Sequence, residues 1–173
     1  MTPPRILLTG APGAGKTTLV RKVVAALSGM PMAGFYTEEI RGQTGRTGFR
    51  AVALDGRTAR LATVGNDPGP RVGRYGVHVP EFEAVALPQL GLASEISLLV
   101  IDEISKMECL SAAFVAAARG ALAAAVPLLG TVALKGGGFI AEVKSAPGVS
   151  IITITLENRD QLAFEIAARF RRG

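Results

Sequence analysis

The stretch that most constrains this chain is an apolar run of strand length followed at once by a glycine-rich loop. Residues 5–9 read RILLT, and residues 10–17 read GAPGAGKT, which fits the pattern G-x-x-x-x-G-K-[ST] at each fixed position. Glycines let the backbone turn so that successive N–H groups face one anion, and a following helix adds the positive end of its dipole. The amphipathic segment 19–27 predicts that helix. Together these features predict a phosphate-binding loop.

The loop pattern assigns a role to each of its polar residues. We expect Lys16 to reach the β- and γ-phosphates of a nucleotide as a point charge and the Thr17 hydroxyl to ligate Mg²⁺. The predicted nucleotide-binding residues are Gly10, Ala11, Pro12, Gly13, Ala14, Gly15, Lys16, Thr17 and Thr18.

A second informative stretch, residues 97–103, reads SLLVIDE. A continuous apolar run that ends in two carboxylates predicts a strand buried on both faces, with the acids at its carboxyl end. Ligands of open α/β sheets bind at that edge. We therefore expect Asp102 to hold Mg²⁺ through water, as the Walker-B acid, and Glu103 to orient or deprotonate an attacking water.

Composition limits the class of protein. A chain of 173 residues with 49% hydrophobic residues is long enough for one core and short for two, so we expect a single domain over residues 1–173. Uninterrupted hydrophobic runs, such as 98–101 and 121–126, fall far short of the ~18 residues of a membrane span. Prolines 3 and 4 lead directly into the first strand, so we expect no export signal. Cys109 is the only cysteine and excludes an internal disulfide. We therefore expect a cytoplasmic protein with no membrane partner.

The net charge of +5 is unevenly distributed. Seven arginines lie between residues 33 and 80 against four acidic residues, so that segment carries a net charge of +3. Such a surface can bind polyphosphate or nucleic acid, which leaves nucleic acid open as a partner; arginine can equally be a solubilising residue here. The seven are Arg41, Arg46, Arg50, Arg57, Arg60, Arg71 and Arg74.

Patterning predicts alternating strands and helices. The first helix is expected over 18–28, and β-like runs at 32–41, 48–54, 60–64 and 74–79 are separated by glycine-containing turns typical of antiparallel hairpins. The later expected elements are helices over 80–92, 111–125 and 139–144, strands over 126–132 and 148–156, and a closing helix from residue 158.

This order predicts an α/β sandwich of the P-loop NTPase type around a mainly parallel sheet. A paired Asp-Glu on the Walker-B strand is typical of P-loop ATPases that place another strand between the two Walker strands. We therefore expect the core order 5-1-4-3-2, with an antiparallel hairpin region inserted at about 33–80 as an added flap.

Several blocks of this sequence resemble a known family. They are GAPGAGKTT at 10–18, GFYTEEIR at 34–41, RTGF at 46–49, VGRY at 72–75, IDEISKME at 101–108 and ENRD at 157–160. Together they resemble the small nucleoside-triphosphatases of thermophilic prokaryotes and animals, which include cancer-related nucleoside-triphosphatase. One departure is Ser105, where the family pattern leads us to expect glycine; its Cβ is expected to restrict a turn beside Glu103.

The resemblance implies Mg²⁺-dependent hydrolysis of NTP to NDP and phosphate with low base selectivity. Hydrolysis needs an in-line water, a metal and positive charge near the leaving group. We assign the water to Glu103, the metal to Thr17 and Asp102, and the charge to Lys16. A further cation is expected from Arg159 or from Lys106.

Two other functions remain open at this point. The same loop serves kinases that phosphorylate a small molecule or a nucleic-acid end, and the arginine-rich segment suits an anionic acceptor. A non-enzymatic RNA- or partner-binding module switched by nucleotide is the other alternative. For each function we expect nucleoside triphosphates as ligands and a monomeric chain.

Overall fold

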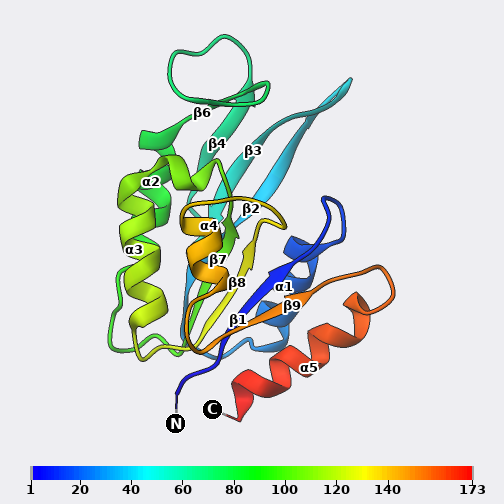
Figure 1. The fold of residues 1–173 in the computed structure, drawn as a ribbon, viewed down its shortest axis with the longest axis vertical. Helices are drawn as coiled ribbons and strands as arrows, with labels where there is room; N and C mark the ends of the chain where they lie inside the picture. Colours follow the sequence, from blue (N-terminus) through cyan, green and yellow to red (C-terminus); the bar gives the residue numbers. More distant parts are fainter. Residues whose placement is uncertain (1, 173) are drawn as a thin grey trace.

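The computed structural model describes residues 2–172 and has helices on both faces of one nine-stranded sheet (Figure 1). In chain order the elements are β1 (Arg5–Thr9), α1 (Lys16–Ala26), β2 (Met32–Gly42), β3 (Gly45–Ala53), β4 (Thr58–Val64), β5 (Arg71–Val72), β6 (Tyr75–Val77), α2 (Val79–Gln89), β7 (Leu98–Ile104), η1 (Glu108–Leu110), α3 (Ala112–Ala123), β8 (Leu128–Val132), α4 (Phe139–Lys144), β9 (Val149–Thr153) and α5 (Arg159–Arg171). Within these residues, no helix combines the length and the apolar composition needed to cross a membrane.

The strands lie in the order β5-β6-β4-β3-β2-β7-β8-β1-β9. The five strands from β2 to β9 pair in parallel, and β2 also pairs antiparallel with β3. The remaining pairs, β3 with β4, β4 with β6 and β6 with β5, are all antiparallel. The 11-residue strand β2 is therefore shared: residues 32–35 pair with β7, and residues 35–42 pair with β3.

The sheet corrects two expectations. Four strand pairs are parallel and four are antiparallel, so the sheet is mixed rather than mainly parallel. The hairpins after α1 do not form a separate flap either, because β3 pairs directly with the shared strand and continues the same sheet. The sequence pattern detected the hairpins but held no information about the edge on which they pair.

Two apolar layers hold the helices on the sheet, and the two-residue period of β1 explains their division. Leu7 belongs to the layer under α2, α3 and α4, whereas Ile6 and Leu8 belong to the layer under α1 and α5. Figure 1 shows the helices of the two layers, α2, α3 and α4 on one side of the sheet and α1 and α5 on the other. The first layer centres on three rings that meet edge to face with centroids 5.4–6.0 Å apart, those of Phe35, Phe82 and Phe114.

Helix α2 ends earlier than the apolar pattern suggested. It covers Val79–Gln89, with Pro88 inside its last turn; the expected helix ran to residue 92, with Pro88 expected to kink or shorten it. Proline has no amide proton and its ring restricts the preceding turn, which explains why the helix ends one residue later. Helix α1 begins at Lys16, two residues before the expected start, so the lysine and threonine of the loop are helical residues.

Candidate functional site

The glycine-rich loop connects β1 to α1 in a conformation that its glycines make possible. Gly15 immediately precedes the helix with φ 96° and ψ 28°, in the left-handed region that favours glycine. At Gly10 a Cβ would lie 2.8 Å from the carbonyl oxygen of Ile154, so only glycine allows that approach of the two backbones. The loop thereby presents the N-terminal end of an 11-residue helix to the carboxyl edge of the sheet.

Lys16 and Glu103, which come from different motifs, meet at this edge. The Lys16 ammonium donates to the carbonyl oxygen of Gly10 at 3.1 Å and lies 3.7 Å from Oε1 of Glu103. Their side chains are 13% and 24% exposed, so each is largely shielded and still reachable from solvent. A carboxylate and an ammonium so placed can share a water and a phosphate between them.

Asp102 lies behind this pair and is fully buried. Its Oδ1 accepts a hydrogen bond from the Thr131 hydroxyl on β8 at 2.5 Å, and its Oδ2 accepts from the Thr37 backbone N–H on β2 at 3.4 Å. Burial raises the pKa of Asp102 to about 6, while hydrogen bonds from Thr131, Thr17 and the Thr37 backbone oppose that rise. The carboxylate is thus fixed between both neighbouring strands and touches the loop threonine.

Thr17 and Asp102 form a donor set that fits Mg²⁺. Among residues 2–172 no group of three or more His, Cys, Asp and Glu side chains is arranged to hold a metal. A hydroxyl and a carboxylate are nevertheless the hard oxygen ligands that Mg²⁺ takes from proteins when phosphates and waters complete its shell. The pair therefore suits a metal that arrives with a nucleotide better than a metal held by protein alone.

A cleft of about 640 Å³ opens over these groups. One wall is the loop with the start of α1, and the other is formed by β2, β3 and the end of β7. The residues that line the cleft are Pro12, Gly13, Ala14, Gly15, Lys16, Thr17, Thr18, Arg21, Thr37, Glu38, Glu39, Arg46, Phe49 and Glu103. Most of the predicted nucleotide-binding residues therefore share one opening with Glu103.

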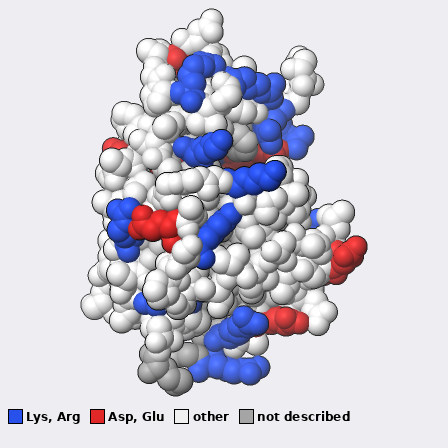
Figure 2. Space-filling model, in the orientation of Figure 1, with Lys and Arg blue, Asp and Glu red and all other residues white. Residues whose placement is uncertain are grey.

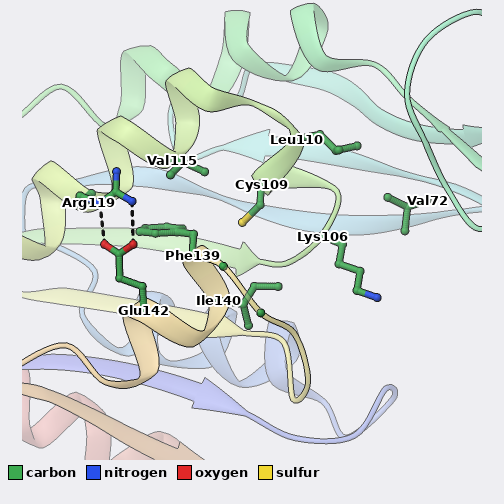
Figure 3. Close-up of a pocket in the computed structure, with 11 residues that line it drawn as sticks. Val72, Lys106, Cys109, Leu110, Val115, Arg119, Phe139, Ile140 and Glu142 are labelled. Atoms are coloured by element: carbon green, nitrogen blue, oxygen red, sulfur yellow. Dashed lines mark hydrogen bonds and ion pairs between the residues drawn. The ribbon is translucent and has the colours of Figure 1, made fainter.

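The two cations predicted to assist Lys16 lie outside this cleft. Arg159, the first residue of α5, lines a neighbouring hollow of about 240 Å³ with Thr18 and Lys22, and a Cβ on Gly15 would lie 3.3 Å from its guanidinium. Lys106 lies beyond Glu103 and lines a groove of about 740 Å³ beside α3 and α4, where Figure 3 shows its amine pointing away from Glu142. Neither side chain lines the cleft that holds Lys16, but Lys106 lines a second cavity together with Glu103.

Arg46 on β3 is a cleft residue that the sequence analysis did not assign to the site. Its Nε donates to the Tyr75 hydroxyl at 3.0 Å and its Nη1 donates to Glu39 at 3.1 Å. The guanidinium also lies over the Phe49 ring, 5.0 Å from its centroid. The register of the hairpin was the signal that could have found it, because Arg46 pairs with Arg41 on β2 next to the Glu38-Glu39 wall of the cleft.

Most of the arginine-rich segment is neutralised by carboxylates. Figure 2 shows many of the lysines and arginines gathered over the end of the molecule that holds the antiparallel strands. Five of the seven arginines form ion pairs: Arg41 and Arg46 with Glu39, Arg50 with Glu38, Arg57 with Asp55, and Arg60 with Glu81. Arg71 and Arg74 donate instead to backbone carbonyls or to Tyr75. Glu38, Glu39 and Asp55 are already counted in the net charge of +3, so only the pair with Glu81 lowers the positive charge that this segment offers to a nucleic acid.

The turn after Glu103 is held by a buried acid. Glu108 is 2% exposed and accepts from the backbone N–H of Ser105 at 3.2 Å and from the Ser105 hydroxyl. Burial raises the pKa of Glu108 to about 8, and the Glu103 charge adds to that rise. Ser105 was expected to restrict this turn through its Cβ; it has no positive φ, so the turn does not require glycine there, and the Ser105 hydroxyl adds a hydrogen bond to Glu108.

Comparison with known proteins gives one consistent answer. Residues 5–167 match a protein family described as NTPase. A cancer-related nucleoside-triphosphatase homolog of Bos taurus is 39% identical, with 96% of each chain covered. The nucleoside-triphosphatase THEP1 of Thermotoga petrophila is 37% identical over 98% of this chain and 95% of its own. The crystal structure of THEP1 from Aquifex aeolicus matches with a TM-score of 0.86 at 35% identity, over 94% of this chain and 96% of that one.

Proposed function

Because this chain belongs to the NTPase family, we propose that it hydrolyses nucleoside triphosphates to nucleoside diphosphate and phosphate. The observation that carries the proposal is the approach of the Lys16 ammonium to the Glu103 carboxylate, 3.7 Å apart in a cleft lined by the glycine-rich loop. The position of β8 between β1 and β7 supports assignment to the P-loop class with core order 5-1-4-3-2.

In the proposed reaction Glu103 accepts a proton from a water molecule. The water oxygen bonds to the γ-phosphorus as the bond from that phosphorus to the β–γ bridging oxygen breaks, and the departing diphosphate keeps the bridging electron pair. Lys16 offsets negative charge on the phosphates, and the backbone N–H groups of the loop bind their oxygens. Glu103 suits its role because it is partly exposed and adjoins both the cleft and Lys16.

Mg²⁺ is the metal we propose, held by Thr17 and Asp102 together with the phosphates; when bound, it neutralises charge on the phosphate oxygens. Asp102 is suited to this because Thr131 and the Thr37 backbone fix both of its oxygens. We propose low base selectivity because the loop contacts serve phosphates alone.

For the additional positive charge we favour Arg46, which lines the cleft. For Arg159 and Lys106 we propose contacts other than this transition-state charge. Arg159 adjoins Gly15 in a hollow that shares Gly15 and Thr18 with the cleft, and we propose that it contacts the nucleotide there, whereas Lys106 lines the cavity beyond Glu103.

The test is phosphate release from ATP, GTP, CTP and UTP, measured with Mg²⁺ and again with excess EDTA. We expect all four to be hydrolysed at rates within about tenfold of one another and activity to disappear with EDTA. An enzyme equally active after the metal is removed would contradict the metal assignment. Release from none of the four would contradict the proposed reaction itself.

A further inference from the structure

A second cavity, of about 270 Å³, adjoins the nucleotide cleft on the far side of Glu103. The two spaces share Thr37, Phe49 and Glu103 as lining residues, so the Glu103 carboxylate stands at the boundary between them. No residue of the glycine-rich loop lines the second cavity. A molecule in the second cavity would therefore lie beside Glu103 without competing for the loop. We call this space the Glu103 side cavity.

The floor of the side cavity is apolar and rigid. It is formed by Phe49 of β3, Leu61 of β4, Val72 of β5, Met107 and Ala133. Leu61 is buried in the main core, and the other four are packed against that core. A floor built by five separate segments of the fold is fixed in place, and it favours a ligand with an apolar body.

The rim of the side cavity is positively charged. Lys106 and Lys135 both line it, and within residues 2–172 neither is within ion-pair distance of a carboxylate. The two carboxylates of its wall are engaged elsewhere, since Glu103 faces Lys16 and Glu108 accepts from Ser105.

Lys106 also lines the neighbouring groove, and the carboxylate that lines this groove, Glu142, forms an ion pair with Arg119. Figure 3 shows Glu142 bonded to Arg119, with Lys106 on the opposite side of that groove. The two lysines therefore place two positive charges, free of ion pairs in the described chain, over an apolar floor.

We propose that the Glu103 side cavity binds a second small molecule, one with an anionic group on an apolar body, while a nucleotide occupies the glycine-rich loop. The anionic group lies at Lys106 and Lys135, and the apolar body lies on the floor at Leu61 and Met107. The proposal depends on the proposed function only in taking the cleft as the nucleotide site. It names the class of molecule that shares Glu103 with the nucleotide.

The test uses phenyl phosphate as the probe, added to the full chain saturated with Mg²⁺ and a non-hydrolysable ATP analogue, with binding followed by NMR titration. We expect saturable binding at millimolar concentration, weakened about fivefold or more in Lys135→Gln, because a charged hydrogen bond is lost. Ala133→Leu, which fills the floor, should weaken it further. Arg57→Gln removes the same charge from a surface ion pair outside the cavity and should leave binding unchanged.

Two further probes separate the parts of the ligand. Inorganic phosphate has the charge without the apolar body, and benzyl alcohol has the ring without the charge, so each should bind at least about fivefold more weakly than phenyl phosphate. Equal binding of inorganic phosphate would overturn the apolar part of the proposal and assign the space to the phosphate product.

Three results would overturn the site as a whole: no binding of phenyl phosphate, its displacement by the nucleotide analogue, or equal weakening by Lys135→Gln and Arg57→Gln. Nucleotide hydrolysis by Lys135→Gln is expected to match that of the unmodified chain. Because binding is measured without turnover, a chain that binds the probe and releases no phosphate from any nucleotide would contradict the proposed function and leave the side cavity supported.

Discussion

The acidic side chains around the parallel half of the sheet differ from those around the antiparallel half in burial and in pKa. In the parallel half, Asp102 and Glu108 are buried, and burial raises the pKa of each. Beside the antiparallel half, the carboxylate of Glu81 is partly exposed and the hydrogen bond from Arg60 lowers its pKa. The parallel half keeps acids whose burial disfavours their ionised form, whereas the antiparallel half keeps its charged side chains in ion pairs at the surface.

The difference shows where chemistry can reside. A buried acid held by Thr131 and the Thr37 backbone keeps its geometry before any ligand binds, which is what preorganised catalysis requires. Exposed ion pairs are screened by solvent and contribute little to stability. Arg46 is the exception in the antiparallel half, because it lines the cleft as well as pairing with Glu39.

The largest effect should come from the carboxylate that borders both cavities. Glu103→Gln keeps the shape and removes the proton acceptor, so kcat for phosphate release should fall by about 10²-fold or more while nucleotide affinity stays within a few fold. Steady-state kinetics and nucleotide binding check the two parts. The matched control is Glu38→Gln, a carboxylate in the same cleft but bonded to Arg50, which should change kcat by less than about threefold. Unchanged turnover in Glu103→Gln would remove the mechanism.

The next effect tests the exception in the antiparallel half. Arg46→Ala should lower kcat by about tenfold to a hundredfold, with a smaller change in KM, if its guanidinium stabilises charge formed in the transition state. Arg50 lies on the same strand and pairs with Glu38, but it does not itself line the cleft, so kcat of Arg50→Ala should stay within about twofold of the unmodified chain. Equal losses in the two variants would mean that the antiparallel half contributes only general charge.

A stability measurement tests the buried acid Glu108. Its pKa in the folded chain is about 8 against an ordinary value of 4.5, so the folded state binds the proton more tightly than the unfolded state. Stability from this group is full below pH 4.5 and is lost as the pH rises through 8, by at most about 1.4 kcal/mol per pH unit.

Glu108→Gln cannot titrate, so its free energy of unfolding should depend less on pH between 5 and 8 than that of the unmodified chain. Urea unfolding at several pH values across this window measures the difference. Parallel pH profiles for the two chains would argue against a protonated Glu108 in the fold.

The smallest effect is expected at the exposed pair of Arg60 and Glu81. Arg60→Gln should leave phosphate release unchanged and shift the melting temperature by no more than about 2 °C, because solvent screens the pair. Thermal unfolding followed by circular dichroism measures the shift. A much larger loss would show that the antiparallel half depends on its ion pairs after all.

The sequence predicted the parts of the site that are continuous in the chain. The glycine-rich loop and the Asp102-Glu103 pair could be found because each is a short continuous motif at one strand: the loop follows β1, and the two acids lie near the end of β7. Arg46 could not be assigned to the cleft in the same way, since its place depends on how β3 pairs with β2. The side cavity needs five segments to meet, and only the folded chain brings Lys106 and Lys135 together.

The share of parallel strand pairs in the sheet was predicted too high for a related reason. The hairpin turns were visible as glycine-containing segments, but the edge that accepts a hairpin is a tertiary choice. Ser105 was considered only for its Cβ, which was expected to restrict the turn, but its hydroxyl also donates a hydrogen bond to Glu108, three residues along the chain.

Strand β2 joins the two halves, since it pairs in parallel with β7 and antiparallel with β3. The two hydrogen-bond ladders use successive stretches of this one strand, so no linker separates the two halves of the sheet. We expect the chain to unfold in one cooperative transition, in which the arginine-rich strands do not unfold separately from the strands that form the nucleotide cleft.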